Sequence, residues 1–152
     1  MFVNKGEITG IDKMHIFYGY TDRVKELQAF EKTTGIKIGL PFVDFTIKIN
    51  DVIVPDTMYS FKKNQKIVFR MLLEHNDVYS QQVIDELSGN TIFFLKRNPD
   101  NKTYGYLSDL HRVKIKSEDD LSVSSEAGDI HPLGISNHKA FVDAIKKTHA
   151  DR

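Results

Sequence analysis

Histidine and carboxylate side chains in the last third of the chain are the residues whose types could support catalysis. Asp109 and His111 lie two positions apart, so on a strand they would point to the same face, where a carboxylate can orient an imidazole as a general base. Asp129 and His131 are followed by His138, and two imidazoles with a carboxylate could bind a metal ion. Their spacing matches no metal-binding motif, so solvated loop histidines are the favoured interpretation. No metal is expected, and the residues define no cofactor.

A second candidate set combines aromatic rings with a guanidinium group, and it consists of Phe17, Tyr18, Phe69 and Arg70. In RNA-recognition domains, aromatic side chains on the first and third strands of a βαββαβ fold stack on unpaired bases. The run 66–73 has no glycine, and it has aliphatic residues where that consensus needs rings. The pI of about 7.0 also disfavours a nucleic-acid partner. Core positions for Phe17 and Phe69 are therefore favoured, and single-stranded nucleic-acid binding stays an alternative.

Composition and motifs exclude several classes of protein. The chain has no cysteine, which excludes disulfide frameworks, thiolate zinc sites and iron–sulfur clusters. It contains no phosphate-binding glycine loop, no nucleophile elbow and no HExxH metal motif. Its uncharged apolar runs are far shorter than the roughly 18 residues that cross a bilayer, and its N-terminus has no apolar signal segment. A cytoplasmic protein without membrane contact is expected.

Length and charge indicate one domain that could associate with other chains. A chain of 152 residues has the size of one domain. It carries 21 basic and 21 acidic residues, so its formal net charge is zero, and little charge repulsion keeps copies apart. Lysine and isoleucine are abundant relative to arginine, a codon bias that hints at a bacterial or phage source. A protein partner or self-association is the expected interaction.

Along the N-terminal half, segments whose apolar residues recur every two positions, as in strands, alternate with segments where they recur every 3.6 positions, as in helices. Thr21 offers an N-cap oxygen for a helix, and Gly35 suits the left-handed residue past its end. Asn50 and Asp51 can form a tight turn between two strands. The elements predicted here are an interior strand over 14–20, a helix over 22–33, a strand over 43–50 with a short hairpin partner over 52–54, a polar turn over 62–65 and a buried strand over 66–73.

The C-terminal half shows the same two periods. Residues 98–102 are typical of a hairpin turn, and Asn137 can cap a helix. Residues 117–130 hold five acidic side chains and no Lys or Arg, so they predict a mobile acidic loop attracted to the basic region 96–116. The elements predicted here are a helix from Asp77 to Gly89, strands over 91–97, 103–107 and 112–116, the acidic loop over 117–130 and a helix over 137–149.

This order of elements predicts an α+β protein with a mostly antiparallel sheet. From 14 to 97 it reads strand, helix, strand, strand, helix, strand, which is the ferredoxin-like βαββαβ order, extended by C-terminal strands and a terminal helix. The alternative is a less regular sheet in which residues 43–73 form a small barrel. The domain predicted is 1–152, with a core over about 14–116, the acidic loop over about 117–130 and the C-terminal helix over about 137–149.

Three functions are consistent with these residues. The leading hypothesis is a non-enzymatic binding or assembly protein that presents a sheet face or an edge at 52–54 or 103–107. The first alternative is a small enzyme that acts on a soluble metabolite or nucleotide with the histidines and carboxylates of the last third. The second alternative is single-stranded nucleic-acid binding through Phe17, Tyr18, Phe69 and Arg70.

Overall fold

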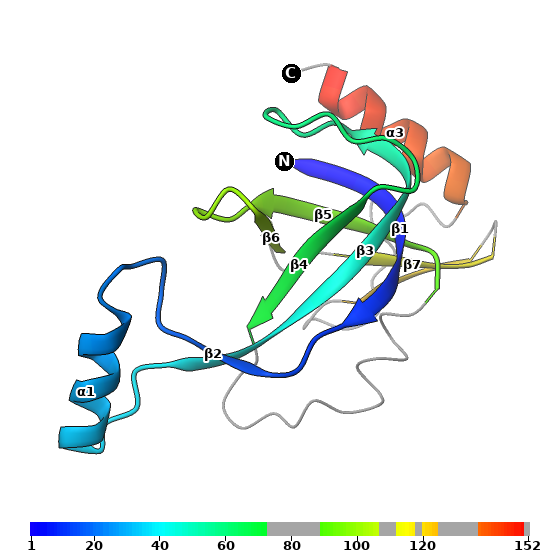
Figure 1. Ribbon diagram of the computed structural model, residues 1–152. Helices are drawn as coiled ribbons and strands as arrows, with labels where there is room; N and C mark the ends of the chain where they lie inside the picture. Colours follow the sequence, from blue (N-terminus) through cyan, green and yellow to red (C-terminus); the bar gives the residue numbers. More distant parts are fainter. Residues whose placement is uncertain (73–88, 107–111, 118–119, 125–136, 151–152) are drawn as a thin grey trace.

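The computed structural model of the protein describes residues 1–72, 89–106, 112–117, 120–124 and 137–150 (Figure 1). Neither of the helices in these ranges is long and apolar enough to span a membrane. The strands are β1 (Phe2–Ile11), β2 (His15–Phe17), β3 (Leu40–Val54), β4 (Lys66–Leu72), β5 (Thr91–Arg97), β6 (Thr103–Tyr106), β7 (Arg112–Ser117) and β8 (Asp120–Ser124), and the helices are α1 (Val24–Thr34) and α3 (His138–Ala150).

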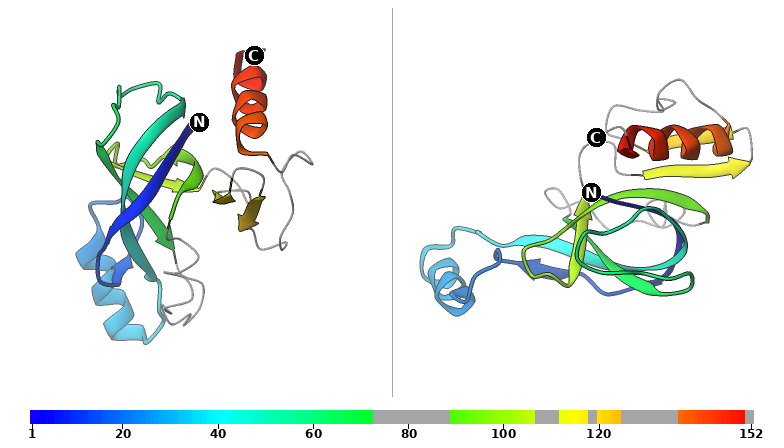
Figure 2. Two further views of the ribbon diagram at one scale, coloured as in Figure 1. Left: turned by 90° about the vertical axis from the view of Figure 1, so that its right-hand side faces the viewer. Right: turned by 90° about the horizontal axis from the view of Figure 1, so that it is seen from above.

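Five of the strands close into a barrel (Figures 1 and 2). Strand β1 pairs antiparallel with β3 on one side and with β5 on the other. Strand β3 pairs antiparallel with β4, β4 pairs parallel with β6, and β6 pairs antiparallel with β5. The order around the barrel is therefore β1-β3-β4-β6-β5 and back to β1. This arrangement matches the five-stranded Greek-key barrel of the OB architecture.

The α+β class and the mostly antiparallel sheet are confirmed, whereas the ferredoxin-like order expected for 14–97 is not. In that order, the strand predicted over 14–20 would lie inside the sheet. Instead β2 spans only three residues and, among the described strands, pairs only with the start of β3. The strand with a neighbour on each side is instead β1. The sequence analysis does not predict β1, because Asn4, Lys5 and Gly6 interrupt its apolar pattern. The small-barrel alternative is closer, since β3 and β4 both belong to the barrel.

Strand β3 is continuous, so the turn predicted at Asn50 and Asp51 is wrong. Both residues stay extended because β1 pairs along most of β3, with Lys5 opposite Asp51. The pairing of β1 with β3 shifts register at three places, and such bulges bend a strand and increase its twist. Bending of this kind lets one long strand pair with β4 through its first half and follow β1 around the barrel through its second half.

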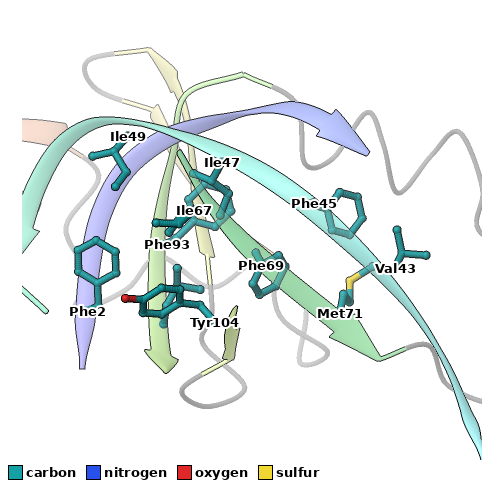
Figure 3. Packing of buried hydrophobic residues seen from close by; sticks show 11 residues of the cluster. Phe2, Val43, Phe45, Ile47, Ile49, Ile67, Phe69, Met71, Phe93 and Tyr104 are labelled. Atoms are coloured by element: carbon teal, nitrogen blue, oxygen red, sulfur yellow. The ribbon is translucent and has the colours of Figure 1, made fainter. Parts of the chain in front are cut away.

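The barrel interior is filled by alternate residues of its strands, and Figure 3 shows these side chains converging between the strands. Residues of β3 at every second position from Val43 to Ile49 point inward together with Phe69 of β4 and Phe93 of β5. The full cluster comprises Phe2, Val43, Phe45, Ile47, Ile49, Ile67, Phe69, Met71, Phe93, Leu95 and Tyr104.

A second apolar cluster lies on the outer side of β5 and packs against α3. Asn137 accepts a hydrogen bond from the Ala140 N–H at 3.0 Å, which confirms the predicted N-cap of α3. The Phe141 ring meets Phe94 with 6.3 Å between centroids. Strand β5 is therefore buried on both faces, which explains its continuous apolar run. The cluster comprises Val3, Ile53, Val54, Ile92, Phe94, Val113, Phe141 and Ile145.

Most of the other predicted elements are confirmed with small changes of length: α1, β4, β5, β6 and β7. Gly35 has the predicted left-handed φ of 73° after α1, but Thr21 does not cap the helix, because Arg23 takes the N-cap position. The acidic loop expected over 117–130 is wrong at 120–124, which form β8 and pair with β7. The alternation of Leu121 and Val123 with polar residues is the overlooked strand signal. The helix predicted from Asp77, and residues 118–119 and 125–130, lie outside the described residues.

Candidate functional site

A cleft of about 290 Å³ opens on the outer face of the barrel. Its walls come from three parts of the chain: β2 and the residues that follow it, the outward side of β4, and the hairpin of β5 and β6. The outer face here differs from the face under α3, since polar and aromatic residues alternate with the buried ones. The cleft is lined by Phe17, Tyr20, Arg70, Leu72, Asn98 and Gly105.

The guanidinium group of Arg70 is held in a fixed orientation beside this cleft. Arg70 and Asp44 are direct neighbours across β3 and β4. Arg70 Nε donates to Asp44 Oδ1 at 2.9 Å, and Nη2 donates to Oδ2 at 3.0 Å, a two-point contact that suits the planar guanidinium group. The hydrogen bonds to Asp44 raise the pKa of Arg70, against the effect of its partial burial. The side chains of Arg70 and Asp44 are 19% and 20% exposed, so a ligand in the cleft can still reach the pair.

A continuous row of aromatic rings lies next to Arg70. The guanidinium carbon stands 4.3 Å from the ring centroid of Phe42 and 6.0 Å from that of Phe17, within the range of cation–π attraction. The ring of His15 stacks on Phe42 with 5.6 Å between centroids. Phe17 meets Phe42 edge-on at 6.0 Å and Tyr20 at 5.0 Å. Planar ligands can stack on the exposed members of such a row.

The hairpin turn at one side of the cleft is held rigid by side-chain hydrogen bonds. Asn98 donates from Nδ2 to Thr103 Oγ1 at 2.9 Å. Asp100 accepts from the N–H groups of Lys102 and Thr103, both at 2.9 Å. Burial opposes ionisation of Asp100, but these hydrogen bonds, helped by the positive charge of Arg70, lower its pKa. The turn therefore presents a preformed wall.

Glycine at position 105 keeps the cleft open. A Cβ atom there would lie 2.9 Å from Oδ1 of Asn98, closer than side-chain contacts in proteins allow. Gly105 also stands beside Arg70, because β4 and β6 run parallel with Phe69 opposite Tyr104. Any side chain at 105 would thus displace Asn98 and project from the outer face next to the guanidinium group.

The structure brings together two of the four residues predicted to bind nucleic acid. Phe17 and Arg70 line the same cleft. Phe69 is fully buried in the barrel core, as predicted, but the core position predicted for Phe17 is wrong, because that ring is only partly buried at the cleft. Tyr18 is directed to α1 instead, where its hydroxyl donates to Glu31. That hydrogen bond raises the pKa of Tyr18 and lowers the pKa of Glu31.

Sequence reasoning missed His15, Tyr20, Phe42 and Asp44 as members of the site. Phe42 and Asp44 alternate with the inward-pointing Val43 and Phe45, so the period of two places them on the outer face. This alternation could have identified Asp44, which lies within the strand predicted over 43–50. It could not have identified Phe42, because the predicted strand began one residue after it.

The predicted catalytic candidates do not form a described site. His138 is the first residue of α3, which packs on the cluster around Val3 and Ile92 rather than at the cleft. Asp109, His111, Asp129 and His131 lie outside the described residues. Within the part of the chain that is described, no three His, Asp or Glu side chains gather as metal ligands would.

Comparisons of the chain with protein-family models, with curated proteins and with solved structures found no match.

Proposed function

We propose that the protein binds single-stranded nucleic acid in the cleft around Arg70, with unpaired bases stacked on the ring row of Phe17 and Tyr20. The observation that supports this proposal is the guanidinium group locked by Asp44 within a row of aromatic rings on an open barrel face. Stacking of a base on an aromatic side chain contributes about 1–3 kcal/mol and tolerates any base sequence. Double-stranded nucleic acid offers no unpaired base faces to such a row.

The position of the cleft on the barrel gives independent support. In OB barrels, ligands bind on the second and third strands and are flanked by the loops after the first and fourth. The corresponding parts of this chain are β3 and β4, the segment 12–39 and the turn 98–102, and three of these four contribute residues to the cleft. This is a fold-level analogy, and the chemistry of the residues carries the proposal.

The neutral net charge provides little electrostatic attraction for phosphates, so binding should depend only weakly on salt concentration. Arg70 is already paired with Asp44, so it adds little net positive charge. Lys96 and Lys102 are exposed beside the cleft, Lys96 directly opposite Gly105. With two such contacts, the logarithm of affinity should fall with the logarithm of salt concentration with a slope of only about −1.4, since each phosphate contact adds about −0.7 on a single strand.

Fluorescence anisotropy with labelled ten-residue oligothymidine and oligouridine, and with a matched duplex, tests the proposal. Phe17→Ala and Tyr20→Ala should each weaken single-strand binding by roughly 5- to 150-fold, the equivalent of one lost base stack. Phe30→Ala is the matched control, because Phe30 is as exposed as Tyr20, 46% against 44%, and lies on α1, outside the lining of this cleft.

Gly105→Val supplies a second probe, because it fills the cleft without removing a ring. It should abolish binding while the circular dichroism spectrum stays that of a folded barrel. Absence of binding to either oligonucleotide at low salt would refute the proposal. An equal loss of affinity in Phe30→Ala would refute the assignment to this cleft.

A further inference from the structure

We infer that helix α1 and the segment 35–39 that follows it form a docking surface for a second copy of this chain, paired about a two-fold axis. Helix α1 projects from the barrel at the opposite end of the molecule from α3 (Figures 1 and 2). None of its residues is buried against the described part of the chain. A helix of 11 residues is marginal in water by itself, since most helical stability in proteins comes from packing an apolar face.

Helix α1 is nevertheless held by hydrogen bonds to the segments that connect it to β2 and β3. The carboxylate of Glu31 accepts hydrogen bonds from the Tyr18 hydroxyl and from the N–H groups of Ile38 and Gly39, the latter two at 2.7 and 3.0 Å. Gly39 also lies so close to Ile16 and Tyr18 that an added Cβ would stand 2.3 Å from the Ile16 side chain. These contacts hold the helix in place, and no other described residue buries its apolar face.

That apolar face forms one wall of a groove of about 690 Å³. Leu27 and Phe30 of α1 face Ile38 across it, and Thr21, Arg23 and Glu26 form its rim. The groove residues Phe30 and Ile38 are well exposed, and so are Ile16, Ile36 and Leu40 on the segments that precede and follow α1. A groove of this size has room for several side chains, and exposed apolar patches of this kind mark interaction surfaces.

The charges at the rim favour a second copy as the occupant. Arg23 donates to Glu26 from Nε at 2.8 Å and from Nη2 at 2.6 Å, so the rim carries one charge of each sign and is neutral overall. In a two-fold interface each residue can meet the complementary residue of its partner. Arg23 of one copy can then face Glu26 of the other, while Phe30 of each copy enters the groove of the other. A strongly acidic or basic partner would find no opposite surplus charge here, and the zero net charge of the chain removes long-range repulsion between copies.

Sedimentation velocity over about 1–200 µM protein tests this inference. Wild type should pass from monomer to dimer within this range, and Phe30→Asp should raise the dimer dissociation constant at least tenfold. Phe30 is 46% exposed, and Met58, on the loop 56–60 outside the groove, is 56% exposed. Met58→Asp therefore controls for the effect of adding one charge to an exposed apolar position, and it should leave the dimer unchanged.

A charge exchange tests the pairing itself. Arg23→Glu and Glu26→Arg should each weaken self-association, because each places like charges across the axis. An equimolar mixture of the two variants should recover a heterodimer. A wild type that stays monomeric to 200 µM, a dimer that survives Phe30→Asp, or a mixture that forms no heterodimer would each overturn the inference.

Discussion

Replacing Asn4 with leucine should stabilise the protein, although it removes a polar residue from a strand of the barrel. Asn4 lies on β1 with Val52 of β3 on one side and Phe93 of β5 on the other. Its side chain is completely buried. Neither Oδ1 nor Nδ2 has a hydrogen-bond partner among the residues that the structure describes.

The expected increase in the free energy of unfolding follows from the removal of these two unpaired polar atoms. A buried polar group without a hydrogen bond costs about 1–3 kcal/mol in the free energy of unfolding. Leucine has the same branched shape as asparagine, so its two methyl groups would occupy the positions of Oδ1 and Nδ2. The space is tight, because a Cβ on Gly6 would lie only 3.1 Å from Oδ1, and the larger methyl groups bring a packing penalty. We expect a net gain of about 1–2 kcal/mol, or roughly 2–8 °C in Tm for a chain of this size.

Urea unfolding followed by far-UV circular dichroism measures this change, with tyrosine fluorescence as a second probe in a chain without tryptophan. Asn4→Ala removes the polar atoms without filling their space. Its free energy of unfolding should be lower than that of the leucine variant, because the alanine leaves a cavity. A leucine variant less stable than wild type by more than about 1 kcal/mol would refute the reasoning. It would mean that the amide is hydrogen-bonded in solution, as by a buried water molecule.

Two further substitutions test how the barrel is held together. Asp56 is 4% exposed and accepts hydrogen bonds from Arg97 at 2.7 Å and from the Tyr104 hydroxyl at 2.8 Å, so Asp56→Asn should lower the free energy of unfolding by about 2–3 kcal/mol in urea titrations at pH 7. Burial opposes ionisation of Asp56, but its hydrogen bonds outweigh that effect and lower its pKa. Its contribution is therefore complete above the ordinary carboxyl pKa of about 4 and is lost as the pH falls through the lower folded value, so wild type and variant should converge in acid. Phe141→Ala should cost about 3–5 kcal/mol in the same assay, because it empties the contact of α3 with Phe94; a cost below about 1 kcal/mol would show that α3 does not need this contact.

The elements that were predicted correctly are those whose local pattern admits one interpretation. Strand β4 is a mostly apolar run that follows the polar turn 62–65, β5 is a continuous apolar run between turn residues, and α1 has helical spacing and a glycine at its end. Closure of the barrel depends instead on β1, which pairs with Asp51 on β3 and with Phe93 on β5. These partners are more than 40 residues away along the chain, and no local pattern specifies which distant strand a strand will join.

The same limit applies to the candidate site. Phe17 and Arg70 were predicted as site residues because they lie near the positions that carry the RNA-binding residues in the βαββαβ fold of RNA-recognition domains. The observed fold is a different one. Their proximity arises from two pairings, β2 with β3 and β3 with β4. Both pairings meet at Phe42, which faces His15 and Leu72. The residue types were visible in the sequence, and the register that unites them was not.

The location of the cleft follows from how the barrel divides its outer surface. On β5, the outward residues Ile92 and Phe94 are apolar and covered by α3, so that side is closed to ligands. On β3 and β4, the outward residues Asp44 and Arg70 are charged, and they satisfy each other across the strands. An arginine already oriented by a carboxylate loses little side-chain entropy when it contacts a ligand, and it keeps its plane beside the aromatic row. The apolar outward residues of β5 therefore stabilise the barrel against α3, whereas the charged outward residues of β3 and β4 form a rigid, partly exposed surface, and this surface is where we propose that a planar ligand binds.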